Sequence, residues 1–292
     1  MPLASLGTIS PPPVTKLLVG ESMARTLRPL SLGKLLDETF DIYRRNFLLF
    51  IGISAIPNLI LLLFQLTLVG IASFDAKSSG VAGALAALGA LFVTQFVSSI
   101  VTAATTFGVS DIYLERPTSM VACFSRVAGK ALRVFFVSFI VSLIIGLGVM
   151  LCIAPGIYWA GVYGIAMPAV VLENITGREA LNRSSGLTKD YVGRVIIVFF
   201  LTTIFTIGMA FALDEVASLV GLPGLRGLGA LPQQVAKELI AALGGILFGP
   251  VTAIALTLVY YDQRVRKEAF DIEHMMSLMP APQNTAAGRT GL

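Results

Sequence analysis

Charge and histidine are scarce in this chain of 292 residues. Charged residues make up 13% of it, about half of the ~25% that is usual for a soluble domain. This deficit excludes an ordinary soluble enzyme. The single histidine, His274, lies beyond the last long apolar run, so the chain cannot form a Ser-His or Cys-His pair among its apolar segments. We therefore expect no enzymatic activity.

Cysteine is also rare. Cys123 and Cys152 are isolated, and the sequence has no C-x-x-C spacing, so we predict neither a disulfide framework nor a metal site. No cofactor is expected. The net charge of +4 is compatible with nucleic-acid binding, but the cations are better explained as determinants of membrane topology, and we expect no nucleic-acid partner.

Long apolar runs, by contrast, are abundant. Four of the five long charge-free stretches are 46–74, 78–110, 195–213 and 239–261. A bilayer core of ~30 Å takes about 20 helical residues, so these four runs predict one spanning helix each. Their predicted bounds are about 47–70, 82–108, 194–216 and 238–261.

The fifth charge-free stretch, 134–172, has 39 residues. As one helix it would be ~58 Å long, about twice the thickness of a bilayer core. Pro155-Gly156 lies near its middle, where a helix must stop or bend. We predict two crossings joined by a tight hairpin there. The expected fold is therefore all-α, a polytopic membrane helical bundle of six transmembrane helices over residues 31–275.

The cations predict the orientation of these crossings. With the N-terminus inside, 18 of the 21 Lys and Arg residues fall in cytoplasmic segments and three in outer ones. Such a bias is typical of cytoplasmic loops. We predict a multi-pass protein of the inner (plasma) membrane with both termini cytoplasmic. The flanking segments 1–30 and 276–292 are predicted to be disordered tails.

Three predicted cytoplasmic segments mix apolar and charged residues at helical spacing. They are 31–46, 117–132 and 178–192, and each precedes a span. We interpret them as amphipathic helices in the cytoplasmic interface, the first with Ser31 as its N-cap. The recurring order of basic residues followed by an aromatic and aliphatic span raises the hypothesis of a threefold repeat of one interfacial helix and two spans.

Polar residues inside the spans are candidate intramembrane site residues. Asn58 follows Pro57, and Gln95 and Thr102 share a polar stripe on the second span. Such a stripe usually packs against neighbouring helices, and the alternative is a polar cavity. Pro168 and Gly249-Pro250 predict further helix breaks, which are structural bends or parts of a midplane site.

Two motifs resemble a known family. They are PAVVLENITGREALNRSSGLTKDYVGR (168–194) and YYDQRVRKEAFDIE (260–273). Together with LDETFDIYRRNF (36–47) they resemble the glycerophosphoryl diester phosphodiesterase membrane domain family, whose members are polytopic bacterial membrane proteins. The matching residues are Glu173, Ala180, Leu181, Arg183, Ser184, Leu187, Thr188, Tyr261, Asp262, Arg264, Arg266 and Glu268. Ser185 stands where the family often has Trp. The chain has no room for a soluble phosphodiesterase barrel, so the resemblance does not imply that activity.

The charged residues of these motifs are candidate site residues on the inner face. Two alternatives are open for them: a structural ion-pair network, or arginines that bind anionic lipid headgroups. The candidates are Glu173, Arg183, Lys189, Asp262, Arg264 and Arg266.

These observations favour a non-enzymatic integral membrane protein that organises lipids or partner proteins at the cytoplasmic face. Its expected partners are membrane lipids, including anionic headgroups, and other membrane proteins. The alternative is a transporter or channel for a small or lipid-like substrate that uses the proline-broken helices.

Overall fold

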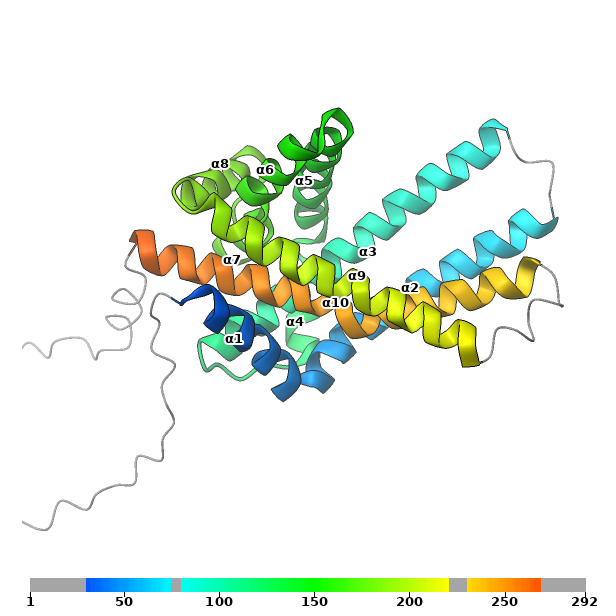
Figure 1. Cartoon of the computed structure of the whole chain (residues 1–292), viewed down its shortest axis with the longest axis horizontal. Coiled ribbons are helices and arrows are strands. Elements are labelled where there is room, and N and C mark those ends of the chain that lie inside the picture. The colour runs from blue at the N-terminus through cyan, green and yellow to red at the C-terminus, as the bar shows by residue number, and fades with distance from the viewer. Residues whose placement is uncertain (1–29, 75–79, 221–229, 269–292) are drawn as a thin grey trace, which may run out of the picture.

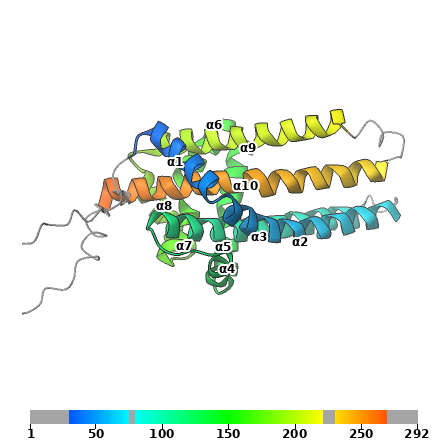
Figure 2. The same cartoon turned by 90° about the horizontal axis from the view of Figure 1, so that it is seen from below.

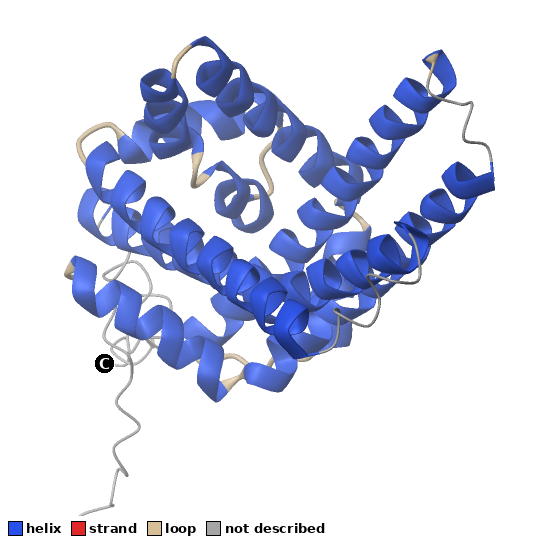
Figure 3. Ribbon diagram, turned by 45° about the vertical axis from the view of Figure 1, so that its right-hand side comes forward, coloured by secondary structure: helices blue, strands red, loops and turns tan. Residues whose placement is uncertain are grey.

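The computed structural model describes residues 30–74, 80–220 and 230–268, and these residues form helices and their connections without any strand (Figure 3). The predicted tails and His274 lie outside the described residues, apart from Leu30. The helices are α1 (Leu32–Arg45), α2 (Phe47–Phe74), α3 (Val81–Tyr113), α4 (Met120–Ala128), α5 (Ala131–Leu151), α6 (Ile153–Tyr163), α7 (Ala166–Glu173), α8 (Gly177–Thr188), α9 (Val192–Val220) and α10 (Ala230–Glu268).

The chain is a helical membrane bundle, as predicted. Six stretches of helix are long and apolar enough to cross a bilayer. Five of them lie in α2, α3, α5, α9 and α10, and the sixth combines α6 and α7 as Ile153–Glu173. Helix α10 continues as one helix beyond residue 261, the predicted end of the last span, to Glu268, and its final turns carry Tyr260 to Glu268 of the second family-like motif.

The turn between the third and fourth spans lies earlier than predicted. The helix stops at Cys152, whose backbone is extended (φ −169°, ψ 145°), and not at Pro155-Gly156. Pro155 is the third residue of α6. A proline is tolerated in a first helical turn because its missing N–H would have no intrahelical partner there. Pro168 likewise lies in the first turn of α7, after the break at Gly164 and Ile165.

Glycines allow α5 and α6 to pack closely on each other. A Cβ added to Gly148 would lie 2.8 Å from the Cα of Gly156. Backbone therefore meets backbone at this point, and a side chain on Gly148 would separate the two helices. The result is a narrow α5–α6 hairpin that projects to one side of the long axis of the molecule (Figure 1).

The predicted amphipathic segments are the helices α1, α4 and α8. Each precedes a long helix in the element order, as the repeat hypothesis expects. Ser31 is the N-cap of α1, as predicted, and its Oγ accepts a hydrogen bond from the Lys34 N–H at 3.3 Å. Helix α1 packs on the last two spans: the Phe40 ring contacts Phe205 of α9 edge-on at 5.0 Å, and the Tyr43 hydroxyl donates to the Leu247 carbonyl of α10.

The core lies at one end of the bundle, where the charged residues also gather. Residues 251–265 of α10 are almost all buried there, and α1, α3, α7, α8 and α9 all contact α10. We call residues 251–268 of α10 and the parts of the other helices that surround them the charged end. The outer half consists of the other ends of α2, α3, α9 and α10, which extend away from the rest of the molecule (Figures 1 and 2). Its apolar side chains are mostly exposed, for example Leu63 at 66% and Phe211 at 68%.

Candidate functional site at the charged end

The first network of the charged end connects α7, α8 and α10. Arg183 of α8 donates from Nε to both carboxylate oxygens of Glu173, at 2.9 and 2.7 Å. Its Nη2 also donates to Oε2 of Glu268 at 2.8 Å. Arg264 donates from Nε to the same Glu268 oxygen at 3.0 Å, and the Tyr260 hydroxyl donates to Glu173 at 2.7 Å. Two carboxylates and two guanidiniums therefore share one site with no net charge.

A sharp turn between α7 and α8 makes this pairing possible. Asn174 ends α7 in the left-handed conformation (φ 60°), which asparagine tolerates better than most residues. Gly177 then begins α8 at φ 49°, a conformation that suits glycine. The chain reverses, and Arg183 returns to Glu173 ten residues earlier. Hydrogen bonds to Glu268 and Glu173 raise the pKa of Arg183 above its usual value, so this guanidinium stays charged.

The second network surrounds Asp262, whose side chain is 0% exposed. Its Oδ2 lies 3.0 Å from Nε of Arg194 on α9 and 3.0 Å from Nε of Arg266 one helical turn away. Its Oδ1 accepts the backbone N–H of Leu30 at 2.8 Å. The Leu30 carbonyl in turn accepts from both arginines. This network joins the start of α1 to α9 and α10, and it places Leu30, which the sequence assigned to the N-terminal tail, in the folded core.

Smaller ion pairs complete the charged end. Asp111 near the end of α3 pairs with Arg126 of α4, and hydrogen bonding to Asp111 raises the pKa of Arg126. Lys267 Nζ lies 2.8 Å from Asp190 in the turn after α8. The Lys267 partner lowers the pKa of Asp190. The short helices α4 and α8 are thus connected to α3 and α10 by charge as well as by apolar packing.

Five of the six predicted inner-face residues belong to these networks. The structure brings Glu173, Arg183 and Arg264 together in the first and Asp262 and Arg266 in the second. Lys189 lies apart, exposed at the C-terminal end of α8. Because the arginines of both networks are paired with carboxylates, the geometry favours the ion-pair alternative over headgroup binding for these side chains.

The site candidates named from the sequence did not include Tyr260, Glu268 and Arg194 of the two networks, or the pair Asp111 and Arg126. A signal existed for two of them. Asp111 and Arg194 are the first charges beyond charge-free runs, and the ends of spans on one side of a membrane meet at one level. The sequence does not indicate which cation each carboxylate contacts.

The predicted intramembrane residues lie in separate helix contacts. Asn58 donates to the Ser54 carbonyl of its own helix at 2.8 Å and faces Gly245 of α10. Gln95 donates to Ser138 and Ser142 of α5 at 2.8 and 3.1 Å. Thr102 donates to the Ser98 carbonyl of α3 at 2.9 Å. These bonds within and between helices are typical of membrane helix packing and do not form one shared polar site.

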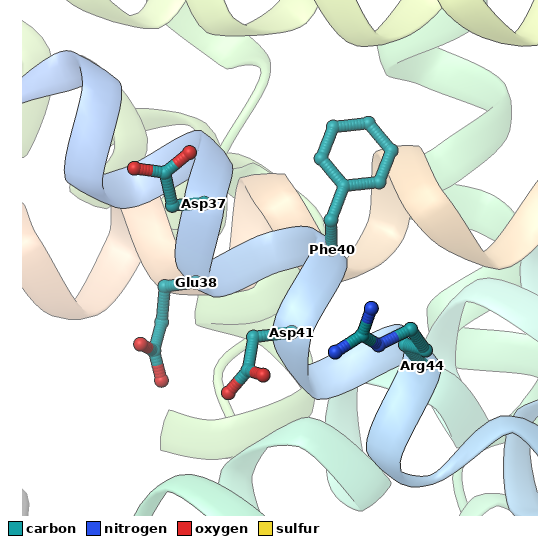
Figure 4. Close-up of a pocket in the computed structure, with 5 residues that line it drawn as sticks. All are labelled: Asp37, Glu38, Phe40, Asp41 and Arg44. Carbon is teal, nitrogen blue, oxygen red and sulfur yellow. The ribbon is translucent and has the colours of Figure 1, made fainter.

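A shallow groove of about 480 Å³ lies on α1 (Figure 4). It is lined by Asp37, Glu38, Phe40, Asp41 and Arg44. Its lining includes none of the residues that the sequence singled out as site candidates. The acidic side chains of this face follow from the amphipathic pattern of α1, whose opposite face buries Leu35, Thr39 and Ile42.

Comparison with protein-family models, with curated proteins and with solved structures finds no match to this chain. The resemblance to the glycerophosphoryl diester phosphodiesterase membrane domain family therefore stays a prediction. Among the described residues, no group of three or more His, Cys, Asp or Glu side chains is arranged to hold a metal ion.

Proposed function

We propose that this is a non-enzymatic integral membrane protein that organises lipids or partner proteins at the cytoplasmic membrane face. The observation that supports this function is the contrast between the two halves of the bundle. Ion-pair networks hold helices from distant parts of the chain together at the charged end, while the outer half exposes apolar side chains to its surroundings. A rigid polar end on a lipid-exposed bundle suits a fixed docking surface better than a moving gate.

The test is the composition of the membrane around the protein. The full chain is extracted with its native lipids into polymer-bounded discs, and the lipids are compared with those of the whole membrane. We expect anionic lipids to be enriched, or a membrane protein to crosslink reproducibly to the charged end. A lipid composition equal to that of the bulk membrane, together with no specific crosslink, would refute the proposed function.

Transport is the second candidate, and one feature favours it. Gln95 and Ser138 are half-buried and Ser142 is exposed, so a hydrogen-bonded polar cluster is accessible on the α3–α5 pair. Pro57 and Pro250 lie inside α2 and α10, and both helices continue past them without the predicted break. Flux of a small or lipid-like solute into vesicles that contain the protein, lost in Gln95→Leu and kept in Thr67→Ala, would favour transport over organisation.

A further inference from the structure

The N-terminus of α5 presents free hydrogen-bond donors. The helix begins at Ala131, and Lys130 at its N-cap makes no side-chain capping bond. The first backbone N–H groups of a helix have no partner within it. The aligned peptide dipoles add partial positive charge at the same place. A helix of 21 residues that begins in this way favours a bound anion.

Two cations, Lys130 and Arg126, lie near this helix start, and only Arg126 is neutralised. Lys130 Nζ lies 5.4 Å from the centre of the Phe107 ring, against which Arg126 also packs at 4.9 Å. Arg126 is paired with Asp111, but within the described part of the chain no carboxylate lies within ion-pair distance of Lys130. One positive charge therefore remains on this side of α5.

Arg133 adds a second positive charge in the first turn of α5. It donates to the carbonyl and to Oδ1 of Asn174, at 3.1 and 2.8 Å. Both acceptors are neutral, so its charge is held in position and not cancelled. Arg178 follows Asn174 by four residues and is exposed. Neither arginine has a carboxylate at ion-pair distance among the described residues. Unpaired positive charge is therefore present beside the start of α5, whereas the arginines of the two networks are neutralised by carboxylates.

An exposed apolar stripe begins at the same point. Leu132 is 67% exposed and Phe136 is 57% exposed. The stripe continues along one face of α5, since residues three and four apart share a face. Its later members are Ile140, Leu143 and Leu147. Arg133 is three residues from both Lys130 and Phe136, so the donors and cations lie at the start of this stripe. That arrangement matches the head and tail of a phospholipid.

We propose that the start of α5 binds the phosphate of an anionic phospholipid through its free N–H groups, Lys130 and Arg133, with an acyl chain along the α5 stripe. This site rests on the proposed function and specifies the lipid class and the place of contact. The phosphate supplies oxygens that accept from the N–H groups and the two cations. The extra negative charge of an anionic headgroup distinguishes it from a zwitterionic one.

The test uses the full chain in detergent micelles, titrated with phosphatidylglycerol and, separately, with phosphatidylcholine, and read by native mass spectrometry. We expect the parent to prefer phosphatidylglycerol. Each basic residue near an anionic membrane surface contributes about fivefold to binding. Lys130→Gln should therefore weaken phosphatidylglycerol binding about fivefold and Lys130→Gln/Arg133→Gln about 30-fold. Lys34→Gln/Arg44→Gln, which removes two exposed cations from α1, should leave it within about twofold.

Controls separate this site from its alternatives. The single variant Lys130→Gln tests the site even if the double variant misfolds, because the Lys130 side chain makes only a ring contact in the described structure. If Lys130→Gln and the double variant bind phosphatidylglycerol as the parent does, the site is refuted, while a parental preference for the anionic lipid would still support the proposed function. A parent without that preference counts against both. Inorganic phosphate that displaces the lipid at equal concentration would identify a soluble-anion site and overturn the proposal.

Discussion

The charged end and the outer half of this bundle share the long helices α3, α9 and α10 but are held together differently. In the span Ile153–Glu173, 56% of the most apolar window is buried within the protein, whereas the corresponding share for Val192–Val216 is 17%. Lipid chains are as apolar as leucine, so exposed side chains in the outer half gain little from packing against each other. The fold is therefore specified at one end, by buried charge pairs and a close-packed α10.

Removing the carboxylate of Asp262 should have the largest effect on stability. Asp262→Ala leaves Arg194 and Arg266 without their shared partner and removes the acceptor of the Leu30 N–H. Breaking a buried ion pair from one side costs about 3–5 kcal/mol. Chemical unfolding in detergent measures the loss. Asp37→Ala, at an exposed position of α1, is the control and should stay within about 0.5 kcal/mol. Equal effects would contradict the contrast between buried and surface charge.

A matched pair of leucine truncations compares the two regions directly. Leu258 on α10 is 0% exposed and Leu63 on α2 is 66% exposed. Leu258→Ala should lower the free energy of unfolding by about 2–5 kcal/mol through a cavity. Leu63→Ala should change it by less than about 0.5 kcal/mol, as at other surface positions. A comparable loss for both would mean that a partner helix covers the outer half.

Glu173→Gln should have a smaller effect than Asp262→Ala. The Glu173 side chain is 20% exposed, and Glu268 still pairs with Arg183 after the change. We expect the free energy of unfolding to fall by about 2 kcal/mol, close to the contribution of one hydrogen bond to a charged group. A double-mutant cycle of Glu173→Gln and Glu268→Gln, measured as free energies of unfolding, tests whether the two carboxylates are coupled. Additive single effects would show that the two carboxylates do not act through one network.

Thiol labelling compares the charged end with the tip of the α5–α6 hairpin in the unmodified sequence. Cys123 is buried beside Thr118, and burial raises the pKa of its thiol. Cys152 is exposed at the tip of the α5–α6 hairpin. We expect a membrane-impermeant maleimide added outside intact cells to label Cys152 and to spare Cys123. Labelling of Cys123 from outside would contradict the predicted orientation. The Cys152→Ser variant is the negative control.

Much of the fold could be predicted from the distribution of charge. The runs without charge mark the spans because a bilayer admits few ionised groups. Ser31 at the start of α1 follows from capping chemistry. The turn at Cys152 was missed because Pro155 has two compatible roles, at a break or in a first turn, and local sequence does not choose between them.

The candidate site was less predictable. Glu173 and Arg183 lie ten residues apart, so their pairing follows from a tight turn and their common charged segment. Asp262 and Arg194 lie on different helices, and their contact depends on the register of α9 against α10. No local pattern specifies that register. For the same reason the sequence could not separate neutralised cations such as Arg266 from unpaired ones such as Lys130.

The contacts of α1 impose an order on biosynthesis. Leu30 is bound by Asp262 and Arg266, and Tyr43 by the Leu247 carbonyl, so the surface that receives the first helix is made largely by the last one. Helix α1 leaves the ribosome early, and most of its docking surface is missing until α10 has been inserted. Completion of the charged end is therefore the closing step of assembly, and a chain truncated before α10 keeps Leu35 and Ile42 uncovered, as an exposed apolar face that quality control can detect.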